Sequence, residues 1–190
     1  MQLPRPTHLV VTVSGHHSKN GWAERALQRL EEQIKPLGLE LNREKTKMVD
    51  LLKGGTFGYL GFDFRMKPTR AGNRQFVLLT PKKKARIKVK AEIRDKIRRG
   101  GAMPMKDLIK GINATLQGWV QYFRVGNSSR AFSEVRDYTE MKVRTLLTRR
   151  KRRRKRSIGW KRWSNEYVYG VLELYWDWKI QPLESVEAYK

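Results

Sequence analysis

The strongest constraint on the fold is an apolar repeat between residues 105 and 123. Apolar side chains recur there every three or four residues, which is the spacing of one face of an α-helix. They are Met105, Leu108, Ile109, Ile112, Leu116, Trp119, Val120 and Phe123. A stripe of this length must be covered by other elements, because most of the stability of a protein helix comes from packing its apolar face.

A second helix is predicted over residues 80–99. Thr80-Pro81 is typical of a helix cap followed by a first turn, and Gly100-Gly101 is typical of a helix end. The apolar residues of this segment also alternate as they do in a strand. The terminal signals and the length favour a helix, whose apolar stripe consists of Val89, Ile93 and Ile97.

A third helix is predicted over residues 129–150, and its inward side chains are Phe132, Val135, Tyr138 and Leu146. Three consecutive helices with short connections predict a three-helix bundle.

Residues 1–79 have a mixed pattern. A helix is predicted from Gly21 to Pro36, capped by Ser18 or Asn20 and ended by Gly38. Short β-branched or alternating runs predict strands on both sides of it. These strands cover residues 9–13, 47–52, 59–65 (where Phe62 and Phe64 share one face) and 75–79.

The last segment, 151–190, opens with the basic run Lys151–Arg156. A short helix capped by Ser164 follows, with Trp163 and Val168 placed for a hydrophobic staple. The flanking aromatic side chains are suited to stacking on nucleic-acid bases, and they are equally suited to a hydrophobic core. The sequence leaves both interpretations open for Trp160, Trp163, Tyr167 and Tyr169.

The charge of the chain is strongly unbalanced. Its 42 Lys and Arg residues face 18 Asp and Glu, which gives a net charge of +24. Twelve basic residues and no acidic residue lie between Lys142 and Arg162, and twelve more lie between Lys82 and Lys110 against three acidic ones. Like charge of this density repels itself, so we expect a polyanionic partner.

Several classes of site and location are disfavoured. Cysteine is absent, which excludes disulfides, thiolate metal sites and cysteine nucleophiles. His8, His16 and His17 show no metal-ligand spacing, so we expect a surface loop and no metal site. No apolar run of about 18 residues and no signal-peptide pattern is present. The expected location is therefore the cytoplasm of a bacterium or the interior of an organelle.

Four motifs resemble the group II intron reverse transcriptases. Residues 37–47 (LGLELNREKTK) are similar to the late palm motif of that family, and residues 57–62 (FGYLGF) to the strand that follows it. Residues 112–123 (INATLQGWVQYF) resemble the signature of the maturase-specific domain, also called domain X or the thumb, and residues 163–167 a later pattern. The motifs are colinear over roughly residues 9–180.

The resemblance implies an α+β fold, with a partial palm-like α/β sheet region, a mainly helical three-helix bundle and a basic helical tail. The corresponding domains are a partial palm remnant at 1–79, a thumb or maturase-specific domain at 80–150 and a basic, aromatic-containing extension at 151–190. In the maturase-specific signature, Gly118-Trp119 and Tyr122-Phe123 are expected in the bundle core, where Gly118 permits a close helix approach.

The catalytic turn of the family is missing. Where its members carry Tyr-Ala-Asp-Asp before a strand, this chain has Pro6-Thr7-His8. Two-metal phosphoryl transfer requires such carboxylates to hold Mg²⁺. We therefore expect no catalytic residue and no cofactor, with Mg²⁺ relevant only if a partner chain supplies the missing palm and fingers. The cysteine-containing endonuclease of longer family members is also absent.

The resemblance and the charge together predict a module that binds structured RNA, namely group II intron RNA, or template–primer nucleic acid, and that assists splicing. The alternatives are the distal subunit of a split RNA-directed DNA polymerase and a non-functional truncated fragment. The expected RNA-binding residues are Lys82, Lys83, Lys84, Arg86, Arg149, Arg150, Arg152, Arg153, Arg154, Lys161 and Arg162.

Overall fold

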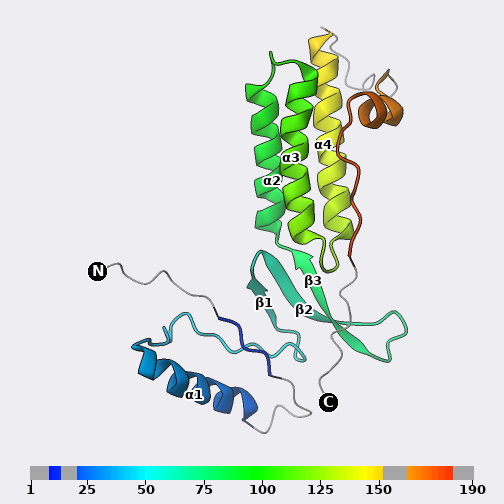
Figure 1. Ribbon diagram of the computed structural model, residues 1–190. Coiled ribbons are helices and arrows are strands. Elements are labelled where there is room, and N and C mark those ends of the chain that lie inside the picture. Colours follow the sequence, from blue (N-terminus) through cyan, green and yellow to red (C-terminus); the bar gives the residue numbers. More distant parts are fainter. Residues whose placement is uncertain (1–8, 14–20, 152–161, 182–190) are drawn as a thin grey trace. The chain divides into compact units, whose positions relative to one another are not determined.

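The computed structural model describes residues 9–13, 21–151 and 162–181 (Figure 1). The chain forms two compact units, Met1–Gly55 and Thr56–Lys190. These units do not coincide with the expected segments 1–79, 80–150 and 151–190. The difference arises because both the three-stranded sheet and the tail pack with the bundle. Helices and one small antiparallel sheet confirm the α+β class.

Among its described residues, the first unit contains one α-helix, α1 (Trp22–Ile34), which continues into the 3₁₀ turn η2 (Lys35–Leu37). Gly38 ends the turn with a φ of 68°, as its predicted role as terminator requires. No residue of α1 is buried, and Trp22 is half exposed. The expected caps, Ser18 and Asn20, lie outside the described residues.

Two strands predicted in this unit are absent. Residues 9–13 and 47–50 have no regular secondary structure, and residues 51–54 form a turn. A strand requires a neighbour that takes up its main-chain N–H and C=O groups. No described segment pairs with either stretch, so their β-branched side chains do not suffice to make strands.

The second unit begins with an antiparallel sheet in the order β1 (Thr56–Tyr59), β2 (Phe62–Pro68) and β3 (Gln75–Pro81). The predicted strand 59–65 is interrupted by a tight turn at Leu60-Gly61, where φ is 43° and 79°. Two residues with positive φ match the right-handed twist of the strands that they connect. Phe64 stacks on its partner Phe57 across the β1–β2 pair, with ring centroids 4.7 Å apart.

The Leu60-Gly61 turn is held by the helices. The Tyr122 hydroxyl donates to the Leu60 carbonyl over 2.9 Å, and the Lys82 N–H donates to the Gly61 carbonyl over 2.8 Å. A Cβ added at Gly61 would lie 3.3 Å from Cζ of Phe123. The turn is therefore both a connection within the sheet and the contact surface between sheet and bundle.

The next helix, α2, spans Lys83–Arg99 and ends at Gly100 as predicted. The predicted start was wrong, because Thr80-Pro81 is the end of β3 and not a helix cap. Both residues pair with β2, opposite Asp63 and Phe62, so tertiary pairing overrides the local helix signal. The buried stripe confirms the helix, with Val89 and Ile93 fully covered.

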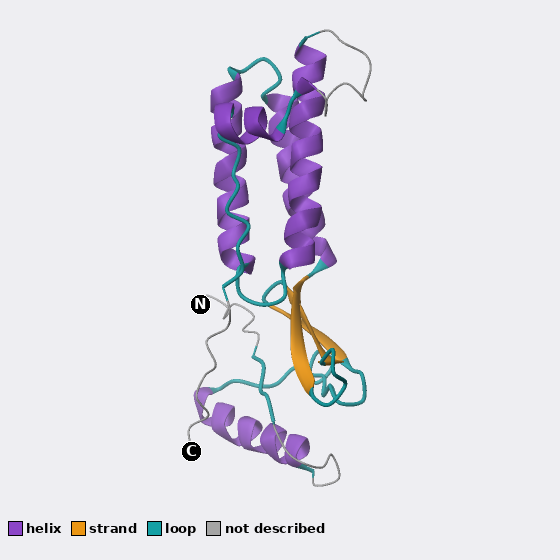
Figure 2. Cartoon of the chain, turned by 90° about the vertical axis from the view of Figure 1, so that its right-hand side faces the viewer, coloured by secondary structure: helices purple, strands orange, loops and turns teal. Residues whose placement is uncertain are grey.

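Helices α3 (Met105–Phe123) and α4 (Ser129–Arg150) complete the three long helices, with the sheet at one end (Figure 2). The predicted stripe of α3 is confirmed: six of its residues are buried and the other two are packed against the core. On α4, Tyr138 is not a core residue. Thr139 and Val143 take the inward positions instead.

The signature residues of α3 divide between core and surface. Trp119 packs against both hydrophobic clusters and Phe123 is buried, as predicted. Tyr122 is 52% exposed and binds the turn through its hydroxyl. Gly118 is also exposed, and a Cβ added there would meet nothing within 4 Å. The expected close helix approach at Gly118 is therefore wrong.

The tail supplies the fourth wall of the core. It enters at Trp163, turns through the π-helix η3 (Glu166–Val171) and runs along the bundle toward the sheet (Figure 1). Trp163, Val168 and Leu174 are buried against α3 and α4 residues in one cluster. The Ser164 hydroxyl accepts from the Tyr167 N–H, in keeping with its predicted capping role.

Of the two interpretations of the tail aromatics, the structure supports the core interpretation for the three that it describes. Trp163 is buried, and Tyr167 and Tyr169 pack against the cluster. Trp160 lies outside the described residues.

We predict that Gly61→Ala destabilises the protein more than Gly72→Ala. Both glycines have positive φ, near 79° and 73°, so each change costs about 1–2 kcal/mol in the backbone. Only the new Cβ at position 61 also meets Phe123, whereas the one at 72 meets nothing within 4 Å. Urea unfolding of the two variants measures the difference, and equal losses would show that the turn does not pack on α3.

Candidate nucleic-acid interface

Several basic side chains of α2 and α4 lie on one shared side of the bundle. Lys90 and Arg94 are four residues apart on α2, as are Tyr138 and Lys142 on α4, and residues at this spacing share a helix face. Contacts from Lys90 to Glu134 and to Tyr138 show that these two faces adjoin. We call this surface the α2–α4 face and define it by Lys83, Arg86, Lys90, Arg94, Tyr138, Lys142 and Arg149.

Glu134 is the carboxylate at the sheet end of this face. It accepts hydrogen bonds from both Arg86 and Lys90. The bond from Lys90, followed by that from Arg86, lowers the pKa of the Glu134 carboxyl against the opposing effect of burial. One carboxylate therefore fixes two cations at defined positions and leaves the face with net positive charge.

Tyr138 lies between two lysines. The Lys90 and Lys142 ammonium groups are 5.5 Å and 5.4 Å from the centre of its ring, within the range of cation–π attraction. The ring thus holds one lysine of each helix in place. This arrangement explains why Tyr138 occupies a surface position in spite of its apolar spacing.

The predicted residues around the start of α2 have different environments. Lys83 and Lys84 are exposed, and Arg86 is bound to Glu134. The Lys82 ammonium lies over Gly58, where an added Cβ would come within 2.1 Å of its Nζ atom. Lys82 is therefore half covered by β1.

The predicted residues at the other end of the bundle are also divided. Arg149 is exposed. Arg150 donates from Nη2 to the carbonyls of Gly100 and Met103, so it ties α4 to the loop between α2 and α3. Arg162 lies over the ring of Trp163. Arg152, Arg153, Arg154 and Lys161 lie outside the described residues, and an RNA contact stays a prediction for all eleven.

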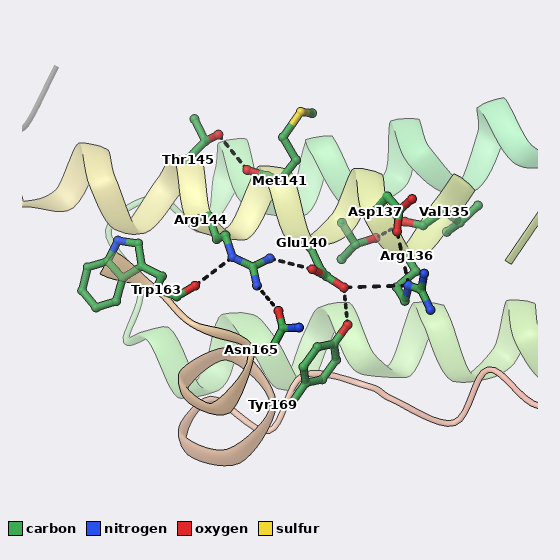
Figure 3. A network of polar contacts seen from close by, with 11 residues as sticks. Val135, Arg136, Asp137, Glu140, Met141, Arg144, Thr145, Trp163, Asn165 and Tyr169 are labelled. Carbon is green, nitrogen blue, oxygen red and sulfur yellow. Dashed lines mark hydrogen bonds and ion pairs between the residues drawn. The ribbon is translucent and has the colours of Figure 1, made fainter. Parts of the chain in front are cut away.

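Sequence reasoning missed the role of Arg144, which it counted among the twelve basic residues between Lys142 and Arg162. The side chain is 2% exposed and lies against the tail (Figure 3). Its Nη1 donates to Glu140 over 2.7 Å, its Nη2 to the amide oxygen of Asn165 over 2.7 Å, and its Nε to the Trp163 carbonyl over 2.9 Å. Three partners of this kind are what a buried guanidinium needs to offset its desolvation.

Glu140 links Arg144 to a third tail residue, Tyr169. The Tyr169 hydroxyl donates to Oε1 of Glu140, while Oε2 accepts from Arg144. Burial, reinforced by this hydrogen bond, raises the pKa of the Tyr169 hydroxyl above its ordinary value. Glu140 and Arg144 thus bind three tail residues to α4.

The tail is bound to α3 by side-chain groups, which hydrogen-bond its main chain as a neighbouring strand would. The Asn113 amide donates to the Glu173 carbonyl over 2.7 Å and accepts from the Tyr175 N–H over 2.8 Å. Near the sheet, Arg124 forms an ion pair with Asp177 over 2.6 Å. The extended tail is therefore fixed along α3 as well as α4.

Two kinds of feature are absent from the described part of the chain. No group of three or more His, Cys, Asp or Glu side chains is placed to hold a metal ion there. Among the same residues, no helix is both long and apolar enough to cross a membrane.

We predict that Arg144→Ala lowers the free energy of unfolding by about 3–5 kcal/mol, because it removes the nearer counter-charge of the buried Glu140 and leaves only Arg136 at 3.9 Å. Arg149→Ala is the matched control, since it removes the same side chain from an exposed site on the same helix. Its loss should stay within about 0.5 kcal/mol. Urea unfolding of both variants tests this, and comparable losses would contradict a structural role for Arg144.

We also predict an acid-sensitive contribution from Glu134. Its folded-state pKa lies below its value in the unfolded chain, so the stabilisation is present above the unfolded pKa. It is lost as the pH falls through the folded pKa. In Glu134→Gln the decline in unfolding free energy between pH 7 and pH 3 should be shallower than in the parent. Identical pH profiles in urea titrations would show that the ion pairs contribute nothing.

Comparison with known protein families gives a match over the bundle and part of the tail. Residues 87–176 match the model of the group II intron, maturase-specific domain. No curated protein matches the chain. The matched range begins within α2 and ends at Trp176, so it includes the tail that closes the bundle core. The chain therefore carries a maturase-specific domain of the group II intron type.

Proposed function

We propose that this chain is an RNA-binding maturase module that binds group II intron RNA through the α2–α4 face and assists its splicing, without polymerase activity of its own. The observation that carries the proposal is the row of Lys and Arg residues along the α2–α4 face. Six cationic residues define this face, and two of them pair with the carboxylate of Glu134. The family match supports a maturase-associated role.

The start of α2 gives a second reason to expect an anionic partner. The N-terminal end of a helix carries partial positive charge, which acidic side chains normally balance. The first turn of α2 has no acidic residue and contains Lys83 and Lys84. Phosphate groups would relieve this repulsion, because anions are favoured at helix N-termini.

The mechanism follows from electrostatics. Phosphates repel each other where RNA helices pack closely, and a row of fixed cations lowers that repulsion. Glu134 and Tyr138 hold Lys90 and Arg86 in place before the RNA arrives, so less side-chain freedom is lost on binding. The cations contact phosphates and do not read base sequence. We place this activity where intron RNA is made, in a bacterial cytoplasm or an organelle interior.

A second candidate function is the distal subunit of a split RNA-directed DNA polymerase. The exposed apolar residues of the first unit favour it, since Trp22 and Leu37 on α1 and η2 are 52% and 71% exposed. A missing palm and fingers on a partner chain would cover such a surface. Co-expression with a neighbouring reading frame that carries Tyr-Ala-Asp-Asp tests this candidate. Mg²⁺-dependent DNA synthesis by the two chains together, and by neither chain on its own, would support it.

We predict that the affinity for a group II intron RNA falls as the salt concentration rises, and that the logarithm of the affinity is linear in the logarithm of the salt concentration. The triple variant R94A/K142A/R149A should bind more weakly and should lower the slope by about 2–3, because each phosphate contact contributes about 0.7–0.9. The matched control is K35A/K45A/K47A, which removes three exposed charges from the first unit. Filter binding between 50 and 300 mM KCl measures both slopes.

Two outcomes would contradict this proposal. An affinity that stays flat to about 0.3 M salt would exclude phosphate contacts as its source. Equal losses in the two triple variants would mean that net charge, and not the α2–α4 face, attracts the RNA.

A further inference from the structure

The tail and α4 enclose an open pocket of about 490 Å³ that the α2–α4 face does not use. Its size falls within the range of about 300–1,000 Å³ that small-molecule sites occupy. Figure 3 shows α4 and η3 contributing several of its side chains around Glu140 and Asn165. The pocket is lined by Arg136, Asp137, Glu140, Asn165, Tyr169, Trp176 and Trp178.

One wall of this pocket is an exposed tryptophan on a fixed support. Trp176 is 68% exposed, whereas Trp163 on the same tail is 8% exposed. Both neighbours of Trp176 are held, since the Tyr175 N–H donates to Asn113 and the Asp177 carboxylate pairs with Arg124. A large aromatic face is thus presented on a segment whose main chain is already ordered.

A polar group of the lining can pair with a ligand. The amide oxygen of Asn165 accepts from Arg144, which leaves its NH₂ group as a donor. An acceptor atom on a bound ligand, such as a ring nitrogen or a carbonyl oxygen, fits this donor.

The charge of the pocket indicates the kind of ligand. Arg136 pairs with Asp137 over 3.2 Å, and Glu140 pairs with the buried Arg144. With Arg144 counted, the charges around the pocket balance, and the two carboxylates of the lining disfavour a phosphate group. Arg136 also lies 3.9 Å from Glu140, so both carboxylates already have a cationic partner and attract a further cation less strongly. A flat, neutral ring with hydrogen-bonding edges fits both the tryptophan face and the polar lining.

We infer that this pocket takes one unstacked nucleobase of the bound RNA, with the base stacked on Trp176 and an acceptor on its edge facing the Asn165 amide. Protein sites for single-stranded RNA combine aromatic stacking with hydrogen bonds to base edges in this way. The inference rests on the proposed RNA-binding function and adds a base-binding site to its phosphate-binding face. Trp176 would thus distinguish unpaired nucleotides from duplex.

The test uses two ligands of equal charge, a ten-nucleotide oligoadenylate and an abasic phosphodiester of the same length. With the full chain, Trp176→Ala should weaken oligoadenylate binding by about 5- to 150-fold, the range of one base–aromatic stack. The same change should leave binding of the abasic strand unaltered. Trp176→Phe keeps an aromatic face and should restore most of the affinity.

The controls separate the pocket from the basic face. R94A/K142A/R149A should weaken both ligands equally, and failure of the parent to bind either ligand would overturn the proposed function itself. Salt-dependent binding that Trp176→Ala leaves unchanged would overturn only the base site. If urea unfolding shows that Trp176→Ala does not fold, the test uses Trp176→Phe instead, and compares its binding of the oligoadenylate with its binding of the abasic strand. Tryptophan quenching by an oligolysine peptide instead of the oligoadenylate would assign the pocket to a cationic partner and overturn the inference.

Discussion

The closed bundle depends on a buried ion pair between Arg144 and Glu140 of α4. Helix α2 packs against both α3 and α4, and the tail fills the core on their remaining side. Arg144 and Glu140 bind that tail at Trp163, Asn165 and Tyr169. Without those bonds, an apolar surface that includes Ile112 and Val135 would lose its cover. The buried ion pair costs desolvation free energy, but its hydrogen bonds fix the position of the tail, which apolar packing alone would leave poorly defined.

Sequence patterns predicted well those elements whose pattern lies within the element itself and extends over many residues. Helices α3 and α4 carry apolar stripes over four or more turns, and the ends of α2 at Gly100 and of η2 at Gly38 follow from backbone chemistry. The strands at 9–13 and 47–52 were wrong because a strand is defined by its neighbour, which no local pattern reports. The same reason explains Thr80-Pro81, where pairing with β2 extends β3 into a predicted helix start.

The candidate site was predictable in composition but not in detail. A run of lysines and arginines indicates an anionic partner, yet it does not show which members are exposed. Arg149 is free in solvent while Arg144 and Arg150 bind the protein itself, and the three look alike in sequence. Glu140, four residues before Arg144, was the one local signal of an internal ion pair. Asn113 and Trp176 depend on where the tail runs, and nothing near them in sequence indicates that path.

The position of the tail determines the order in which the protein folds during its synthesis. Residues that complete the core, such as Val168 and Leu174, leave the ribosome only after α2, α3 and α4 and the strongly basic stretch that follows them. Until then the emerging helices have an open apolar side and a high positive charge, beside a ribosome made largely of RNA. The core therefore closes last, only when the segment with Val168 and Leu174 has been synthesised.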